Sequence, residues 1–372
     1  MTYSDNLISK ISPKLLMGPG PSMVSPEIYK ALSSPIIGHL DPEFIAIMDE
    51  IKVMIRDVLN TKNNLSVPIS GTGSAGMETC FVNLVSPGDD VLILANGVFG
   101  NRMEDVATRL GAKVDTIQRP WGEVILVDEV KKQLQRKDYK IVAIVHAETS
   151  TGVANPVQEI GELVKDSNAI YLVDAVTSMG GMEIRMDDWH IDALYSGTQK
   201  CLSCPPGLSP VSFSPKAVRV IQNRKTKVPS WYLDLSMLIA YWDGNSRTYH
   251  HTAPINMLYG LYQALLSLLN EGKKNVYTRH QKTHDYLVQG LDKIGLKMLV
   301  NPKDRLTMLN SVIIPDGVNE AEIRSQLLNH YHIEIGGGLG ALSGKIWRIG
   351  TMGHTAYKAN IDLLLNALRK IL

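Results

Sequence analysis

Two ionisable residues stand out because each follows a short apolar run. Asp174 ends the apolar part of "YLVDAV", and Lys200 follows "ALYSGTQ", 26 residues further along the chain. A carboxylate buried at the end of a strand costs free energy unless a cation or hydrogen bonds compensate it. The ends of neighbouring parallel strands lie close together, so Lys200 is the natural cation for Asp174. The alternative is that Asp174 only caps the following turn through hydrogen bonds.

A glycine-rich segment, "SGTGSAGMET" (70–79), lies between an apolar run and a helical pattern. Gly71, Gly73 and Gly76 fit the pattern G-x-G-x-x-G, which by itself indicates a nicotinamide-dependent oxidoreductase. That function also requires an acidic residue at the end of the next strand, but "VLILANG" ends without one, and Asp89 and Asp90 precede this strand. The more general interpretation is a phosphate held by N–H groups at a helix N-terminus. A tight turn without a ligand is the other alternative.

Together these features match the requirements of pyridoxal 5′-phosphate. A lysine binds this cofactor covalently as a Schiff base, a carboxylate keeps the pyridine nitrogen protonated, and a helix N-terminus holds the phosphate. The sequence therefore predicts pyridoxal phosphate on Lys200, with Asp174 as the partner of the pyridine nitrogen. A binding or scaffold protein without catalysis would have no use for Asp174, Lys200 and Arg348 at three strand ends.

The elements that must position these residues alternate along the first part of the chain. Val/Ile-rich runs cover 65–70, 91–96, 113–118, 140–148, 169–176 and 193–197, and helical patterns cover 41–59, 74–85, 100–110, 127–136 and 156–166. This alternation is typical of an α/β fold with a mainly parallel sheet covered on both faces by helices. Ligands of such sheets bind at the C-terminal ends of the strands, where Asp174 and Lys200 are expected.

The pattern changes near residue 275, which indicates a smaller C-terminal α/β domain. A helical run at 256–270 precedes a long helix, strands at 298–300, 310–315, 333–337 and 345–350, a helix at 319–330 and a last helix to Leu372. We expect an N-terminal arm (1–22), a large cofactor-binding domain (23–255), a connecting helix (256–276) and the small domain (277–372).

Composition narrows the classes of function. The 38 basic and 37 acidic residues give a formal charge of +1 without a basic cluster, so we expect a small-molecule substrate and no nucleic acid. No secretory signal or membrane span is expected, and the C-terminal "RKIL" resembles a peroxisomal signal only loosely, so we expect a cytoplasmic protein. The pair Cys201 and Cys204 lacks a second pair for a zinc site, so we expect reduced, structural thiols and no metal.

Ten ordered motifs resemble one family almost from end to end. They are "LLMGPGPS" (15–22), "SGTGSAGMET" (70–79), "NGVFGNR" (96–102), "ETSTGV" (148–153), "VDAVTSMGG" (173–181), "SGTQK" (196–200), "RKTK" (224–227), "YHHTAPI" (249–255), "GGLG" (337–340) and "RIGTMGH" (348–354). The chain resembles the class V aminotransferases of pyridoxal-phosphate fold type I, and among them the alanine–glyoxylate and serine–pyruvate aminotransferases. The resemblance implies a large domain with a seven-stranded sheet and a smaller C-terminal domain.

The resemblance also implies roles for individual residues. It supports Lys200 as the Schiff-base lysine and Asp174 as the partner of the pyridine nitrogen. The other residues that it assigns to the cofactor are Phe99 stacked on the ring, Ser150 and Val176 lining it, Gly73, Ser74 and Gln199 at the phosphate, and Tyr249 and Thr252 reaching the phosphate from a second subunit. Many relatives have Trp at the position of Phe99, and some have His at that of Ser74. A site completed by a second subunit implies a homodimer.

The substrate is expected beside Arg348, which the resemblance assigns to the substrate carboxylate together with Ser150. An arginine within the apolar segment "KIWRIG" needs an anion, and a guanidinium binds a carboxylate in a bidentate fork. His39 and Asn256 are expected near the substrate side chain.

The implied reaction is ping-pong transfer of the amino group of alanine, or serine, to glyoxylate. Ureidoglycine or 3-hydroxykynurenine as the donor, and a lyase or a desulfurase on the same scaffold, are alternatives. A desulfurase needs a cysteine on a mobile loop, and Cys201 next to Lys200 is poorly placed for that role.

Overall fold

A seven-stranded sheet forms the centre of the computed structural model, which describes residues 6–242 and 247–372. Its strand order is β2-β10-β9-β8-β5-β3-β4, and only β10 runs antiparallel to its neighbours. The strands are β2 (Leu65–Ser70), β3 (Asp90–Ala95), β4 (Lys113–Gln118), β5 (Ile141–Val145), β8 (Ile170–Asp174), β9 (Ala193–Tyr195) and β10 (Leu208–Phe213). The predicted mainly parallel sheet is confirmed.

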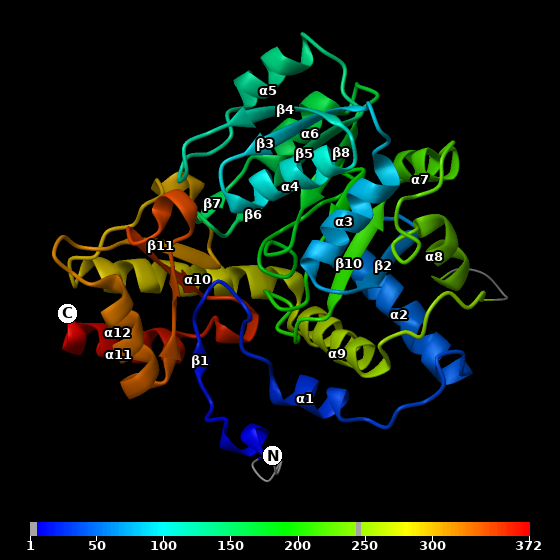
Figure 1. The fold of residues 1–372 in the computed structure, drawn as a ribbon. Coiled ribbons are helices and arrows are strands. Elements are labelled where there is room, and N and C mark those ends of the chain that lie inside the picture. Colours follow the sequence, from blue (N-terminus) through cyan, green and yellow to red (C-terminus); the bar gives the residue numbers. More distant parts are fainter. Residues whose placement is uncertain (1–5, 243–246) are drawn as a thin grey trace, which may run out of the picture.

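Helices flank this sheet, as Figure 1 shows. They are α1 (Pro26–Leu32), α2 (Pro42–Leu59), α3 (Gly73–Leu84), α4 (Val98–Arg109), α5 (Val127–Leu134), α6 (Val157–Val164), α7 (Pro215–Gln222), α8 (Leu235–Trp242) and α9 (Ile255–Glu271). The sequence predicts the start of α2 correctly, because the side chain of Asp41 accepts a hydrogen bond from the N–H of Glu43 and Pro42 is the first helical residue.

The C-terminal part has a hydrophobic core of its own. Its antiparallel sheet has the order β11-β14-β13, and its elements are α10 (Lys273–Asp292), β11 (Leu309–Ile313), α11 (Glu320–Tyr331), β12 (Ile333–Glu334), β13 (Gly336–Gly337), β14 (Ile346–Gly350) and α12 (Lys358–Ile371). The predicted strand at 298–300 is wrong, because only Met298 pairs there, in an isolated bridge to Val312.

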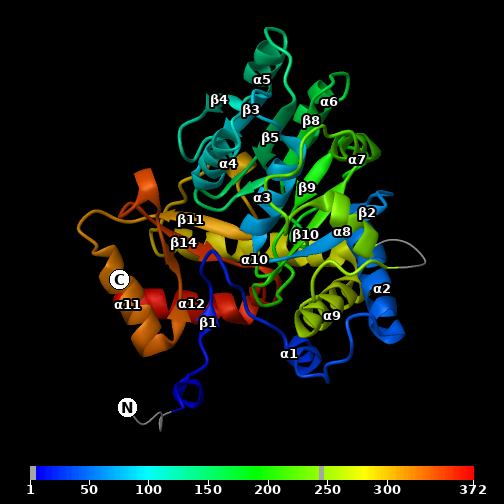
Figure 2. The same cartoon turned by 45° about the vertical axis from the view of Figure 1, so that its right-hand side comes forward.

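The N-terminal arm is attached to this C-terminal part. Strand β1 (Leu15–Leu16) pairs in parallel with β12, and Met17 is buried in the C-terminal core. Figure 2 shows β1 beside the C-terminal helices. Residues 1–5 of the predicted arm lie outside the described residues.

Short elements complete the chain. A small antiparallel hairpin consists of β6 (Ala147–Glu148) and β7 (Val153–Ala154). The 3-10 turns are Leu7–Lys10, Pro302–Asp304, Gly340–Leu342 and Gly353–Thr355. No helix in the described part of the chain is long and apolar enough to cross a membrane.

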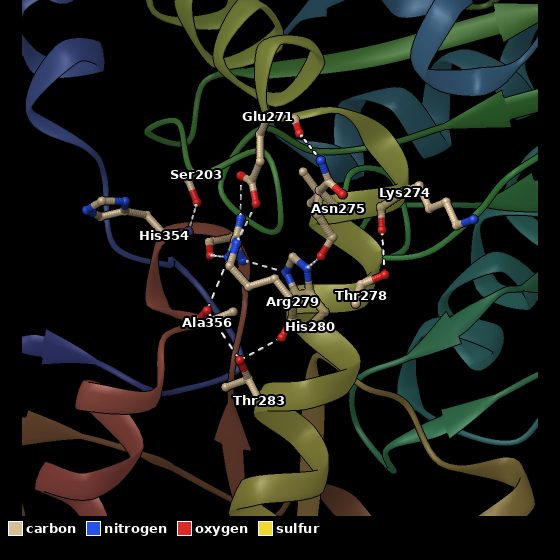
Figure 3. Close-up of polar contacts among 12 residues, drawn as sticks. Ser203, Glu271, Lys274, Asn275, Thr278, Arg279, His280, Thr283, His354 and Ala356 are labelled. Atoms are coloured by element: carbon tan, nitrogen blue, oxygen red, sulfur yellow. Dashed lines mark hydrogen bonds and ion pairs between the residues drawn. The ribbon is translucent and has the colours of Figure 1, made fainter.

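Helix α10 joins the two cores, since Val276 packs in the large core and Leu287 in the small one. Gly272, with φ of 87°, separates α9 from α10, so the predicted connecting segment 256–276 contains almost all of α9 and the first turn of α10. At this junction Arg279 of α10 binds both carboxylate oxygens of Glu271, and Figure 3 shows it reaching the loop that follows β14. The boundaries of the two domains remain predictions.

Candidate active site

A pocket that opens to solvent lies at the C-terminal ends of β8 and β9. It combines carboxylate, amine, guanidinium and aromatic groups. Its lining residues are Thr72, Gly73, Ser74, Met77, Phe99, Arg102, Val145, Ala147, Thr149, Asp174, Val176, Thr177, Tyr195, Gln199 and Lys200. The structure thus brings together seven of the residues predicted from sequence: Gly73, Ser74, Phe99, Asp174, Val176, Gln199 and Lys200.

Asp174 is the last residue of β8 and only 3% exposed. Its carboxylate accepts hydrogen bonds from the N–H of Val176 and the hydroxyl of Tyr195, both at 2.8 Å. Burial raises the pKa of Asp174 to about 7, although these hydrogen bonds and the charge of Lys200 oppose the shift. Asp174 therefore both caps the following turn, through the N–H of Val176, and lines the pocket. Tyr195, which the sequence analysis did not identify as a site residue, fixes the carboxylate from the neighbouring strand.

Lys200 follows β9 in a turn that the N-terminal arm holds in place. Its Nζ donates a hydrogen bond to the carbonyl of Pro19, and the hydroxyl of Ser22 donates to the Lys200 carbonyl at 2.6 Å. The pKa of Lys200 is lowered to about 8, mainly by burial and also by the positive charge of Arg348. The close approach explains Gly20, which has a φ of 112°, because a Cβ there would lie 2.7 Å from the Lys200 Nζ.

The N-terminus of α3 forms the third wall of the pocket. Gly73 is its first residue, and a Cβ at this position would lie 2.8 Å from Cγ2 of Val176. Gln199 also lines the pocket, and its buried Oε1 has no hydrogen-bond partner. Arg102 donates a hydrogen bond to the hydroxyl of Ser74 at 3.4 Å and lies 5.0 Å from the centre of the Phe99 ring. The sequence analysis did not single out Arg102, which adds a cation to this wall.

Arg348 lies in the middle of β14 and is 6% exposed. Its Nε donates to the carbonyl of Gly337 at 2.7 Å and its Nη1 to that of Thr149 at 3.2 Å. Among the described residues, Arg348 forms no ion pair with a carboxylate. Burial lowers the pKa of this guanidinium and the charge of Glu148 opposes the shift. A buried cation held only by carbonyls can still accept a carboxylate ligand.

Six predicted site residues do not line this pocket, and Arg348, described above, is one of them. Ser150 is fully buried behind it, and its hydroxyl donates to Glu148. Tyr249 is 56% exposed, with its hydroxyl 3.4 Å from that of Thr252 and its ring 5.2 Å from the ring of His39. The side-chain amide of Asn256 donates to the carbonyls of Leu32 and Ser34, so it holds the chain after α1 within this subunit.

Comparisons with known proteins identify the family of this chain. The family model described as aminotransferase class-V matches residues 27–354. The chain belongs to the class-V aminotransferase family. The rat protein named alanine–glyoxylate aminotransferase is 40% identical over 365 residues, which cover 97% of this chain and 88% of that protein.

Two solved aminotransferase structures have the same fold as this chain. Alanine–glyoxylate aminotransferase from Nostoc sp. has a TM-score of 0.94 and 46% identity, with both chains fully covered. Ureidoglycine–glyoxylate aminotransferase from Bacillus subtilis has a TM-score of 0.96 and 38% identity over 97% of this chain and 93% of that one. The fold-type-I architecture is confirmed. Membership of an aminotransferase family also argues against the nicotinamide-dependent alternative for Gly71–Gly76.

Proposed function

We propose that this class-V aminotransferase uses pyridoxal phosphate to transfer the amino group of a small L-amino acid to glyoxylate. Alanine is the preferred donor and serine is also accepted, so the products are pyruvate or hydroxypyruvate together with glycine. The observation that carries the proposal is the single pocket that holds Asp174, Lys200 and the N-terminus of α3. The names of the rat and Nostoc relatives support the choice of donor and acceptor.

The lining residues fit the cofactor. The N-terminus of α3 lines the pocket, and its N-cap residue Thr72 makes no side-chain capping hydrogen bond, so the N–H groups of the first turn suit a phosphate. Gln199 lines the same pocket, and its side-chain NH₂ group can donate to a phosphate oxygen. Gly73, Ser74 and Gln199 would hold the phosphate, Phe99 would stack on the ring, Val176 would line it, and Lys200 would form the covalent bond. When bound, pyridoxal phosphate supplies an electron sink for the charge left by removal of the substrate α-proton.

Asp174 would hold the proton on the pyridine nitrogen. The pKa of Asp174 is raised to about 7 because the hydrogen bonds and positive charge around the carboxyl group do not offset the effect of burial. Asp174 would accept a hydrogen bond from a protonated ring nitrogen, and the added positive charge would lower the pKa of Asp174.

Lys200 would move the α-proton. An amine with a pKa of about 8 is partly neutral near neutral pH, so it can accept a proton and return it without a large energetic cost. General base catalysis of this kind typically contributes about 10²–10⁴-fold to the rate. Arg348 would bind the substrate carboxylate and so orient the α-carbon toward the Lys200 amine.

We also propose a homodimer in which Tyr249 and Thr252 complete the partner's site. Both lie outside their own subunit's pocket, and Tyr249 is 56% exposed. Trp231 and Tyr232 nearby are 60% and 41% exposed, which adds apolar surface for a second copy to cover. In such a dimer, His39 would reach the substrate through its contact with Tyr249. Asn256 would contribute to the substrate site through the position of the chain after α1.

Ureidoglycine is the second candidate donor, because the similar Bacillus subtilis enzyme is named for it. 3-Hydroxykynurenine remains an untested alternative. A desulfurase is not favoured, because burial raises the pKa of the Cys201 thiol to about 12 and keeps it from acting as a nucleophile.

The absorption spectrum of the purified protein tests the proposal. Protein loaded with pyridoxal phosphate should be yellow, should lose the colour with L-alanine and should regain it with glyoxylate. Lys200→Ala should bind the cofactor without the covalent bond and without this cycle. If ureidoglycine bleaches the colour and alanine does not, the assignment of alanine as the donor is wrong, while the assignment of the cofactor is correct. A colourless protein would overturn the cofactor assignment.

A further inference from the structure

The carboxyl group of Glu148 is fully buried, yet it forms no ion pair within the described residues. Four donors surround it instead. Oε1 accepts from the N–H of Ser150 at 3.1 Å and from its hydroxyl at 2.6 Å. Oε2 accepts from the N–H groups of Phe99 at 3.2 Å and Gly100 at 3.4 Å. Glu148 therefore joins the hairpin β6–β7 to the first turn of α4, which lie together in Figure 1.

These contacts suit a carboxylate anion. Each of the four partners donates, and the Ser150 hydroxyl accepts from the N–H of Val98 at 2.9 Å, so its own proton points to Glu148. The N-terminus of the 12-residue helix α4 adds a favourable dipole. Burial raises the pKa of Glu148, and these hydrogen bonds lower it. A proton on the carboxyl group would leave a donor facing a donor.

The residues fixed by Glu148 belong to the proposed reaction. Phe99 lines the pocket, and the Thr149 carbonyl accepts the hydrogen bond from Arg348 Nη1. The fit around the carboxyl is tight, because a Cβ at Gly97 would lie 2.4 Å from Cδ of Glu148. One side chain thus connects the cofactor side of the pocket with the arginine of the substrate side.

We propose that Glu148 is a positioning residue of this site. Its buried carboxylate sets the position of Phe99 against the cofactor ring and, through the turn at 149–150, the position of Arg348. The inference rests on the proposed function for the roles of Phe99 and Arg348. The hydrogen bonds that carry it belong to the chain alone.

Glu148→Gln tests this inference, because the amide has the shape of the carboxyl group but cannot accept at both atoms. In either orientation an NH₂ group faces a main-chain N–H, either at Ser150 or at Phe99. This variant loses hydrogen bonds to a charged group, which contribute more free energy than those between neutral groups. We therefore expect the Kd for pyridoxal phosphate to rise about 10-fold or more. In the cofactor-free protein, amide exchange of a peptide covering 97–102 should accelerate about 10-fold, with other peptides unchanged.

The matched control is Glu159→Gln, an exposed glutamate in the first turn of α6. It should leave exchange and Kd unchanged. At saturating cofactor, Glu148→Gln should also alter the visible circular dichroism of the bound cofactor and raise the KM for alanine, which a change in stability alone would not do.

Wild-type values for Glu148→Gln in exchange, Kd and circular dichroism would overturn the inference. If this variant does not fold, Ser150→Ala replaces it, because it removes one donor and keeps the carboxylate. A Kd in Ser150→Ala equal to that of the wild type would then overturn the inference. A wild-type protein that never binds pyridoxal phosphate would refute the proposed function, while exchange at 97–102 would still decide the role of Glu148.

Discussion

At the scale of single residues, the amine of Lys200 links the chemistry of the site to the stability of the protein. Burial lowers its pKa from 10.5 to about 8 in the folded chain. Between these two pH values the unfolded chain binds a proton that the folded chain does not. The contribution of this residue therefore makes the cofactor-free protein more stable as the pH rises from about 8 to about 10.5, by about 3 kcal/mol at most.

Replacing Lys200 by Met should remove this pH dependence. Methionine fills a similar volume and never titrates, so Lys200→Met should gain stability relative to the wild type at pH 8 and lose most of that gain at pH 10.5. Urea unfolding of the two cofactor-free proteins at both pH values measures their free energies of unfolding. The difference between the two proteins at each pH removes the contributions of the other titrating groups, which both proteins share. A difference that does not change with pH would contradict the lowered pKa of Lys200.

At the scale of elements, the sequence predicts what depends on local pattern. The runs that correspond to β2 and β4 are predicted at their observed bounds, because turn residues flank each of them clearly. β10 was not identified, although its sequence "LSPVSF" has the same mixture of apolar residues, serines and a proline as β2. The contact between Lys200 and Pro19 spans 181 residues, and no local pattern indicates it. Likewise, the hydrogen bonds of Glu148 to α4 depend on tertiary packing.

The segment before α1 acts as one wall of the lysine site, and its glycines allow a test. Gly20→Ala would place a Cβ 2.7 Å from the Lys200 Nζ at a φ of 112°, whereas at Gly18 the nearest atom is 3.6 Å away. Strain of about 1–2 kcal/mol and the displaced amine should reduce covalent cofactor capture by Lys200 about 10-fold or more in Gly20→Ala. Borohydride reduction followed by mass spectrometry measures the trapped fraction. Gly18→Ala should capture the cofactor like the wild type, and equal capture by both variants would contradict this account.

At the scale of the whole molecule, a polar junction holds the two cores together beside the site (Figure 3). Arg279 binds both oxygens of Glu271 at 2.7 and 2.9 Å and donates to the carbonyls of Gly353 and Ala356. The same loop is held by Ser203, whose hydroxyl accepts from the N–H of His354 at 2.6 Å. Because this loop follows β14 and Ser203 follows Lys200, the junction connects the strand of Arg348 to the lysine turn.

Arg279→Lys keeps the charge of the junction but loses the planar fork that makes four contacts at once. We expect the position of β14 relative to Lys200 to loosen, so the KM for alanine should rise about 5- to 10-fold while kcat changes less, with a stability loss of about 2 kcal/mol. Steady-state kinetics and thermal unfolding measure the two effects. Arg119→Lys is the matched control, since Arg119 binds Glu123 and Glu129 within the large core alone. It should cost stability without raising KM, and an equal rise in KM in both variants would show that the junction does not position Arg348.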